Sequence, residues 1–452
     1  MMKSITKPSS EDARVGRGRW LSALVLGFLL SLVSLNDASG QKTDVILIIA
    51  DGFGWSDPSI HQKSAIKTPN IDSIGSEGIR ADRYLVTEPG TASLAAILTG
   101  KYSISSRMNE GESPSEVPGN QFRFDDSSMG KVFRKNGYRT GWFGRPYFSG
   151  ESEDSGDRLG FEIFPPTGNE KAGEFQSSGQ KTDVPVAVAN EVERGNEAIL
   201  ADFEQFLTGG TDDQSDAPYL AVITPFSYRP TDLVPAGVLQ SLELEIEDDG
   251  DQTEARSAVS AYEIDRTVGK LLKLIADQEV GTEPLVIFTS SGREPEENRK
   301  PWLEEHGAGI DESGTRVPFF VKGKWVASGK MIVPPIADID LLPSLKTFCS
   351  LLKDDADQSY DGVSMAALAY GLPMRWKDRM LFQFDTESGE AGAVRTIEWR
   401  AVRAPSEGSE WRLFHMFIDP RQENDLGEQN RSEVLKLSTK LKQAYDQRQN
   451  RD

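Results

Sequence analysis

The chain has 452 residues, of which 37% are hydrophobic and 9% aromatic, enough for one large domain and a smaller one. A mean hydropathy of −0.44 argues against a polytopic membrane protein. The formal charge of −21 repels polyanions at long range, which argues against a nucleic-acid partner. The single cysteine, Cys349, excludes an intramolecular disulfide.

The N-terminal segment has the residue order of a secretory signal. Three arginines precede the apolar stretch Trp20–Leu35, and the small residues Ala38 and Gly40 follow it. The apolar stretch, about 16 residues long, is shorter than the ~20 residues that a spanning helix needs. We predict that residues 1–40 are a signal peptide, that the protein is exported to the periplasm or secreted, and that no stable membrane span remains after cleavage. An uncleaved signal that anchors the chain in the membrane is the alternative.

The mature chain begins with an unbroken apolar run, Asp44–Ala50, which ends at the loop signal Asp51–Gly54. Such a run is typical of a central parallel strand that is covered on both faces. Similar runs follow at Thr140–Gly144, Tyr219–Thr224, Leu285–Ser290 and Phe319–Val321. Helical patterns lie between them, so we predict an α/β fold with a mixed, mostly parallel central sheet flanked by helices.

Three helices can be placed from their end signals and apolar spacing. The first has Thr68 as its N-cap and stops at Gly78, and the second opens at Thr91 or Ser93. A longer one is predicted over Ser257–Asp277. Its candidate core residues are Val259, Tyr262, Val268, Leu271, Leu272 and Ile275.

Two acidic stretches, 209–217 and 243–254, are expected to be solvated surface insertions, because their carboxylates lack the spacing of a calcium-binding loop. Residues 150–195 are rich in Gly, Ser and Glu and show no clear periodicity.

The pattern changes near the C-terminus. Alternating, aromatic-rich segments predict antiparallel strands, and a polar helix is predicted to close the chain. The strands are expected at Met380–Phe384, Val394–Val402 and Glu410–Ile418, and the helix at Arg431–Gln449. We therefore predict a large domain over residues 41–375 and a smaller C-terminal α+β subdomain over 376–452.

A series of segments in the same order resembles the sulfatase family, in the alkaline-phosphatase-like superfamily, along almost the whole mature chain. These segments are DVILIIADGFGWSD (44–57), TPNIDSIGSEGIRADRY (68–84), AAILTGKY (95–102), GYRTGWFGR (137–145), LGFEIF (159–164), YEIDRTVGKLL (262–272), ESGTRVPFFV (312–321), DIDLLPSL (338–345), DGVSM (361–365) and IDPRQENDLGE (418–428). The resemblance implies a site at the C-terminal ends of the strands and hydrolysis of sulfate esters. It also implies an oxidised cysteine as nucleophile, a calcium ion, and Lys and His side chains that handle protons.

The family's nucleophile position is occupied by glycine in this chain. The shared ending at Gly100 places Gly90 in the cysteine slot and Leu94 in the arginine slot. Glycine has no side chain to oxidise, and Cys349 lies in an apolar helical stretch elsewhere. We predict a catalytically degenerate pseudo-sulfatase. The alternative is an active sulfuric- or phosphoric-ester hydrolase that uses Thr91 or Ser93 as a rearranged nucleophile.

The metal and proton-transfer slots are also altered. Asp51 remains from the family's first carboxylate pair, Gly52 stands beside it, and Ser290-Ser291 occupy the late pair. Calcium prefers six to eight oxygen ligands, so no cofactor is expected, although Ca²⁺ would be the family metal. Glu294, Glu296 and Glu297 are the alternative ligands. Gly307 replaces the expected lysine, and the chain's three histidines, His61, His306 and His415, match no catalytic slot.

The remaining residues favour binding. Arg145 can pair with an anion, and the helix that Thr91 opens would point its N–H groups at the same place. Tyr147, Tyr228 and Phe226 would add aromatic walls suited to a sugar. The predicted ligand is a sulfated or other glycan, a small anion, or a protein partner, and a regulatory subunit of an active relative is a third hypothesis.

Overall fold

The computed structural model describes residues 42–62, 66–106, 122, 124–146, 155–165, 184–209, 217–228, 234, 236–242, 253–278, 283–292, 312–351, 359–373, 376–384, 391–404 and 408–449. From Thr43 onward the chain forms one compact unit. The predicted signal peptide and both predicted acidic insertions lie largely or wholly outside the described residues. Within the described ranges, no helix has the length and apolar character needed to cross a membrane.

A mixed, mostly parallel sheet of seven strands forms the centre of this unit, as predicted. In order across the sheet the strands are β4 (Arg139–Gly144), β5 (Tyr219–Thr224), β1 (Val45–Ala50), β6 (Leu285–Ser290), β8 (Phe320–Lys322), β2 (Ile79–Ala81) and β9 (Lys330–Ile332). The first four are parallel, with Val45 opposite Leu285 and Ala50 opposite Ser290. β8 is antiparallel to β6 and β2. Every residue of β1 and β6 is buried, which explains their unbroken apolar sequences.

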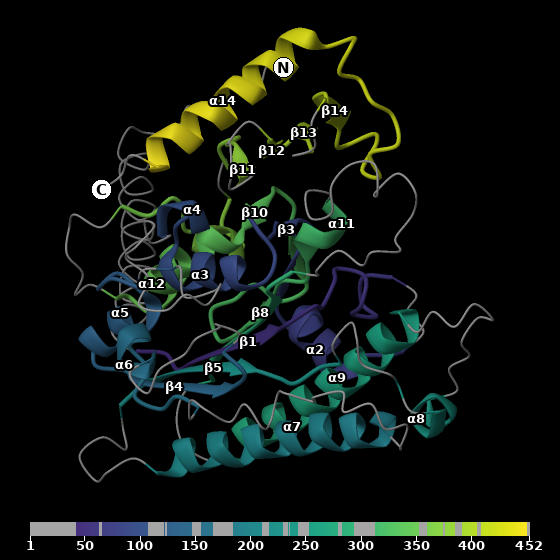
Figure 1. Cartoon of the computed structure of the whole chain (residues 1–452). Helices are drawn as coiled ribbons and strands as arrows, with labels where there is room; N and C mark the ends of the chain where they lie inside the picture. The colour runs from purple at the N-terminus through teal and green to yellow at the C-terminus, as the bar shows by residue number, and fades with distance from the viewer. Residues whose placement is uncertain are drawn as a thin grey trace, which may run out of the picture. The chain divides into compact units, whose positions relative to one another are not determined.

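Helices cover both faces of the central sheet. Val45, Leu47 and Ile49 pack with α3 (Thr91–Thr99), α5 (Met129–Lys135) and α12 (Leu341–Phe348). Ile46 and Ile48 pack on the other face with α2 (Pro69–Glu77), α7 (Val184–Thr208) and α9 (Thr253–Asp277). Figure 1 shows α7 and α9 on one side of the sheet and α3 and α12 on the other. The shorter helices are α4 (Ser103–Ser106), α6 (Ser155–Leu159), α8 (Ala236–Ser241), α11 (Glu312–Thr315), the 3-10 turn η2 (Asp338–Asp340) and α13 (Ala366–Ala369).

Two smaller sheets complete the unit. The first, in the order β10 (Ile336–Ala337), β3 (Tyr84–Leu85), β7 (Arg316–Val317), lies along the segment that leads to α3. The second is the predicted C-terminal antiparallel sheet. Its strands are β11 (Leu381–Phe384), β12 (Gly392–Arg395), β13 (Trp399–Arg403) and β14 (Arg412–His415). The closing helix α14 (Arg431–Gln449) packs Leu437 and Leu441 against it, and Figure 1 shows α14 lying along this sheet.

Three details differ from the sequence prediction. Helix α7 begins at Val184, inside the segment 150–195 that shows no periodicity, and its apolar side chains Ile199 and Phe203 are buried against the sheet. Tyr262 was predicted to be a core residue but is 38% exposed. The segment Val394–Val402 contains two strands, β12 and β13, because the chain turns back between them. These features depend on packing rather than on local spacing.

Candidate functional site

The C-terminal ends of two central strands meet the first turn of α3. The N–H of Gly90 donates to the carbonyl oxygen of Ser291 at 2.9 Å, and the N–H of Gly52 donates to that of Gly292 at 3.1 Å. Gly52 follows β1 and Ser291 follows β6, which are parallel neighbours. Open α/β sheets bind their ligands at this edge. The structure therefore brings Asp51, Gly90 and Ser291 together, as the resemblance implies.

Asp51 is held by serine hydroxyl groups. The Oγ of Ser291 donates to Asp51 Oδ1 at 2.6 Å, and the Oγ of Ser227 lies 3.5 Å from the Asp51 carbonyl oxygen. The Oγ of Ser290 accepts the N–H of Gly292 at 3.1 Å. Both serines in the late metal slot are fully buried, and both hydroxyls are engaged by neighbouring protein groups.

These side chains do not fit a calcium ion. Calcium prefers several charged oxygen ligands, and here one carboxylate, that of Asp51, already accepts a hydrogen bond from Ser291. Gly52 contributes no side chain. Among the described residues, no group of three or more His, Cys, Asp or Glu side chains is arranged to hold a metal. The alternative ligands Glu294, Glu296 and Glu297 lie outside those residues, so Asp51 is the one metal-slot carboxylate among the described residues.

Gly90 is the N-cap of α3, and the helix begins at Thr91, one of its two predicted starting residues. Its φ of 78° and ψ of −138° lie in a region that L-residues with a side chain rarely adopt. A Cβ at Gly90 would meet no described atom within 4 Å, so backbone conformation rather than crowding favours glycine here. The carbonyl of Gly90 accepts the N–H of Leu94 at 3.2 Å, which leaves the earlier N–H groups of α3 without an intrahelical acceptor. They create a partial positive charge at the site.

The four residues predicted to bind an anion do not share one place. Arg145 directly follows β4 at the same edge of the sheet, and its N–H donates to the Thr224 carbonyl at 3.3 Å. Tyr147 lies outside the described residues. Tyr228 is 8% exposed and packs in an apolar cluster with Val192 and Val259, between α7 and α9. Arg145 and the N-terminus of α3 at Thr91 therefore carry the described part of the predicted anion site.

The two alternative nucleophiles differ in accessibility. Thr91 is the first residue of α3 and is half-buried. Ser93 is 0% exposed, so its hydroxyl is not in contact with solvent. Of the two, only Thr91 is open to the site.

A buried carboxylate that the sequence reasoning did not single out supports the loop before Gly90. Asp338 Oδ2 accepts the N–H of Thr87 at 2.9 Å and its Oγ at 3.2 Å, and Asp338 Oδ1 accepts the N–H of Ile339 at 2.9 Å. Burial raises the pKa of Asp338 to about 7, although these hydrogen bonds act in the opposite direction. The only signal in the sequence is the acidic pair in DIDLLPSL.

The described histidines and the cysteine lie in packed environments. His61 Nδ1 lies 2.6 Å from the Trp55 carbonyl oxygen, its ring stacks on Trp55, and burial lowers its pKa to about 4. His415 lies on β14, 3.1 Å from Glu398. Cys349 caps α12 and is 3% exposed, and burial raises its pKa to about 12, so its thiol is inert at neutral pH. His306 lies outside the described residues.

Known proteins with a similar sequence or fold are sulfatases or have been solved with the same scaffold. The sulfatase family model covers residues 43–347. A sulfatase of Formosa agariphila is 24% identical over 498 residues, which cover 90% of this chain and 87% of that protein. Human arylsulfatase D is 28% identical over 152 residues, covering 31% of this chain and 26% of that protein. The chain thus matches about a quarter of the human relative's length and most of the bacterial relative's.

A solved structure also has the same fold. The crystal structure of Ps i-CgsB in complex with k-i-k-neocarrahexaose has a TM-score of 0.68 and 21% identity to this chain. The similarity covers 90% of this chain and 93% of that one.

Proposed function

The chain belongs to the sulfatase family, and from that premise we propose that it is an exported member that has lost sulfate-ester hydrolysis and binds an acidic glycan instead. The family reaction is the hydrolysis of sulfate esters, which needs an attacking atom on the nucleophile residue.

The single observation that carries the proposal is Gly90 at the start of α3. It occupies the nucleophile slot, and its carbonyl and N–H groups are both used in backbone hydrogen bonds to Leu94 and Ser291. No side chain there can form a covalent intermediate. Thr91, one residue on, has no described histidine or metal ligand set beside it to activate its hydroxyl.

The ligand is proposed from the charges at the same edge. The guanidinium of Arg145 suits the oxygens of a sulfate or carboxylate, and the N-terminus of α3 adds a favourable partial charge. With its formal charge of −21, the whole protein has no general attraction for polyanions, so a local site must supply the affinity. The complex of Ps i-CgsB with k-i-k-neocarrahexaose supports a carbohydrate ligand on this fold.

The test compares turnover with binding in one preparation. We expect residues 41–452 to hydrolyse neither 4-nitrophenyl sulfate nor 4-nitrophenyl phosphate, with or without added calcium, and calcium to leave the melting temperature unchanged. Inorganic sulfate should raise the melting temperature, because a ligand at 100 times its Kd stabilises the folded state by about 2.7 kcal/mol.

Two variants assign these signals to the site. Arg145→Gln should reduce the sulfate-dependent shift, whereas Arg134→Gln, an exposed arginine of α5 paired with Asp157, should keep it in full. Turnover of either ester at an ordinary enzymatic rate, dependent on a divalent ion, would overturn the proposal. If that turnover disappeared in Thr91→Ala, the rearranged hydrolase would take its place.

A further inference from the structure

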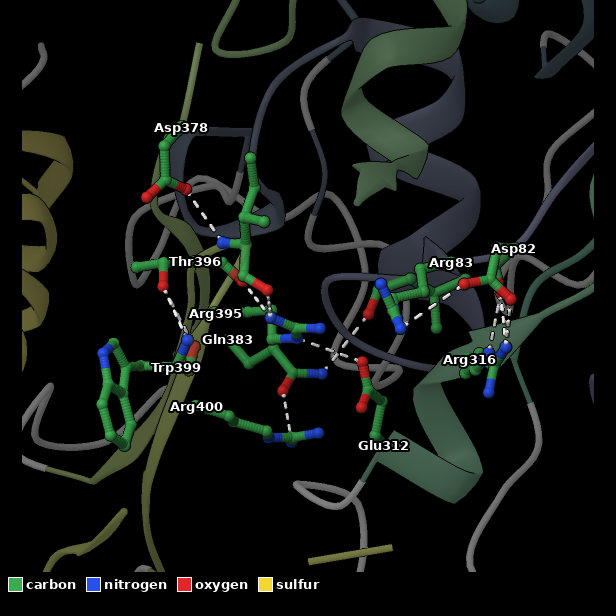
Figure 2. A network of polar contacts seen from close by, with 12 residues as sticks. Asp82, Arg83, Glu312, Arg316, Asp378, Gln383, Arg395, Thr396, Trp399 and Arg400 are labelled. Carbon is green, nitrogen blue, oxygen red and sulfur yellow. Dashed lines mark hydrogen bonds and ion pairs between the residues drawn. The ribbon is translucent and has the colours of Figure 1, made fainter. Parts of the chain in front are cut away.

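A cluster of arginines lies between the C-terminal sheet and the segment that leads to the site. Arg395 ends β12, Arg83 directly precedes β3, and Arg316 opens β7. Figure 2 shows Arg395 reaching from the C-terminal sheet toward Glu312, with Arg83 and Arg316 beyond that carboxylate. Sequence reasoning did not connect these residues, since they come from three distant parts of the chain.

Arg316 is held by its neighbours through Nε and Nη2. Its Nε and Nη2 donate to the Asp82 carbonyl oxygen at 2.9 and 2.6 Å, and Nη2 also donates to Asp82 Oδ1 at 3.0 Å. Its guanidinium lies 3.8 Å from the centre of the Trp55 ring. Arg316 therefore has a structural role, and a ligand would have to use the other members of the cluster.

Arg395 has donor capacity left over. Its side chain is 4% exposed, its Nε donates to Glu312 Oε1 at 3.3 Å, and its Nη1 donates to the carbonyl oxygens of Thr396 and Ile397. Its buried Nη2 has no hydrogen-bond partner in the part of the chain that the structure describes. A buried guanidinium N–H without an acceptor is unfavourable, so this group would gain from an added oxygen.

The neighbouring charges repel one another. Burial lowers the pKa of Arg395, Glu312 raises it, and the charge of Arg83 lowers it again. Burial also lowers the pKa of Arg316, and Arg83 and Arg395 both act in the same direction there. The carboxylate of Glu312 raises the pKa of both groups and offsets part of this repulsion, and an added anion would offset more of it.

The cluster reaches the surface at Arg83. The Arg83 side chain is 16% exposed, its Nη2 lies 3.5 Å from Asp82 Oδ2, and its guanidinium carbon lies 5.8 Å from the centre of the Phe417 ring. Phe417 is 54% exposed. An exposed aromatic ring beside a charged group suits the face of a sugar and its acidic substituent.

Beside Arg395, side chains of the C-terminal sheet contact the loop that ends at Gly90. The Nε2 of Gln383 donates to the Val86 carbonyl oxygen at 3.4 Å, and the Nη2 of Arg400 donates to Gln383 Oε1 at 2.9 Å. Val86 precedes Gly90 by four residues, so at most about 14 Å of chain separates this contact from the start of α3. One extended ligand could contact both places.

We propose that Arg83 and Arg395 bind a second oxyanion, a sulfate or carboxylate group, on the same glycan whose first acidic group binds near Arg145. This inference rests on the proposed function and adds a second charged group to its ligand. The Phe417 ring packs against the sugar that carries this group. The ligand class is therefore an oligosaccharide with at least two acidic substituents.

Calorimetric titration with inorganic sulfate at constant ionic strength tests the assignment, and acetate in a parallel series distinguishes a carboxylate from a sulfate site. We expect two sites in the wild-type protein. Arg83→Gln should weaken one of them at least tenfold, and Arg395→Lys should weaken the same one, because lysine keeps the charge but loses the planar fork. Arg412→Gln, a half-exposed arginine of β14, is the matched control and should keep both sites.

The outcomes separate this inference from the proposed function. A single sulfate site that disappears in Arg145→Gln and is unchanged in Arg83→Gln and Arg395→Lys would overturn the second site and leave the proposed function standing. A single site lost only in Arg83→Gln would support the arginine cluster and contradict the site at Arg145. Circular dichroism of each variant shows whether it folds, and Arg83→Gln answers the question if Arg395→Lys does not fold, since Arg83 is at the rim.

Discussion

Replacing Asp338 by asparagine is expected to change how the stability of the protein depends on pH. The Asp338 carboxylate is fully buried and accepts hydrogen bonds from Thr87 and Ile339, so it connects η2 to the loop before Gly90. Burial raises its pKa from 3.8 to about 7. The charged form is therefore disfavoured in the folded state relative to the unfolded chain.

The raised pKa of Asp338 determines the sign and the size of the change in the free energy of unfolding with pH. Because the folded pKa lies above the unfolded one, the favourable contribution of the protonated Asp338 is complete below pH 3.8 and is lost as the pH rises through about 7. About three pKa units correspond to about 4 kcal/mol, and about 3 kcal/mol of this loss falls between pH 5 and pH 8. Asparagine does not ionise, although it turns one acceptor into a donor at a cost of about 1 kcal/mol at every pH.

Urea denaturation of the wild-type protein and Asp338→Asn at pH 5 and pH 8 measures the effect. The stability of the variant relative to wild type should rise by about 3 kcal/mol from the lower to the higher pH. Asp202→Asn, which changes an exposed carboxylate on α7, should show no comparable rise. A relative stability of Asp338→Asn that is constant or falls with pH would refute the reasoning.

Three further substitutions test the packing around the site and the C-terminal helix by urea denaturation. Gly90→Ala should destabilise the protein by about 1–2 kcal/mol through its positive φ rather than through a clash, and an unchanged midpoint would contradict this. Arg448→Ala should lower the free energy of unfolding by about 3 kcal/mol, because it leaves the buried carboxylate of Asp361 without its cation. In the folded protein Arg448 lies 2.9 Å from that carboxylate and 4.7 Å from the centre of the Tyr102 ring. Lys442→Ala, which changes an exposed cation on the same helix, is the control. Phe203→Ala should cost about 3–5 kcal/mol, since its ring is fully buried between α7 and the sheet, and a smaller loss would mean that α7 packs more loosely.

Local sequence was sufficient wherever one residue type or one unbroken pattern decides the structure. The strands Tyr219–Thr224 and Leu285–Ser290 have the predicted bounds, because strands covered on both faces are apolar throughout and are bounded by polar loop residues. The helix Arg431–Gln449 also has the predicted bounds. The altered nucleophile slot needs only the identity of Gly90, because no fold can supply a side chain to glycine.

The site itself depended on contacts between distant residues. The hydrogen bond from Ser291 to Asp51 joins the ends of two strands that are 240 residues apart, and Tyr228 turns away from the expected pocket into an apolar cluster. The local sequence pattern also gave no indication of where α7 begins or that Arg83 and Arg395 lie in one cluster. Sequence patterns report the backbone periods and residue types that a segment prefers, whereas burial, charge repulsion and hydrogen-bond partners depend on which segments the fold brings within a few ångströms of one another.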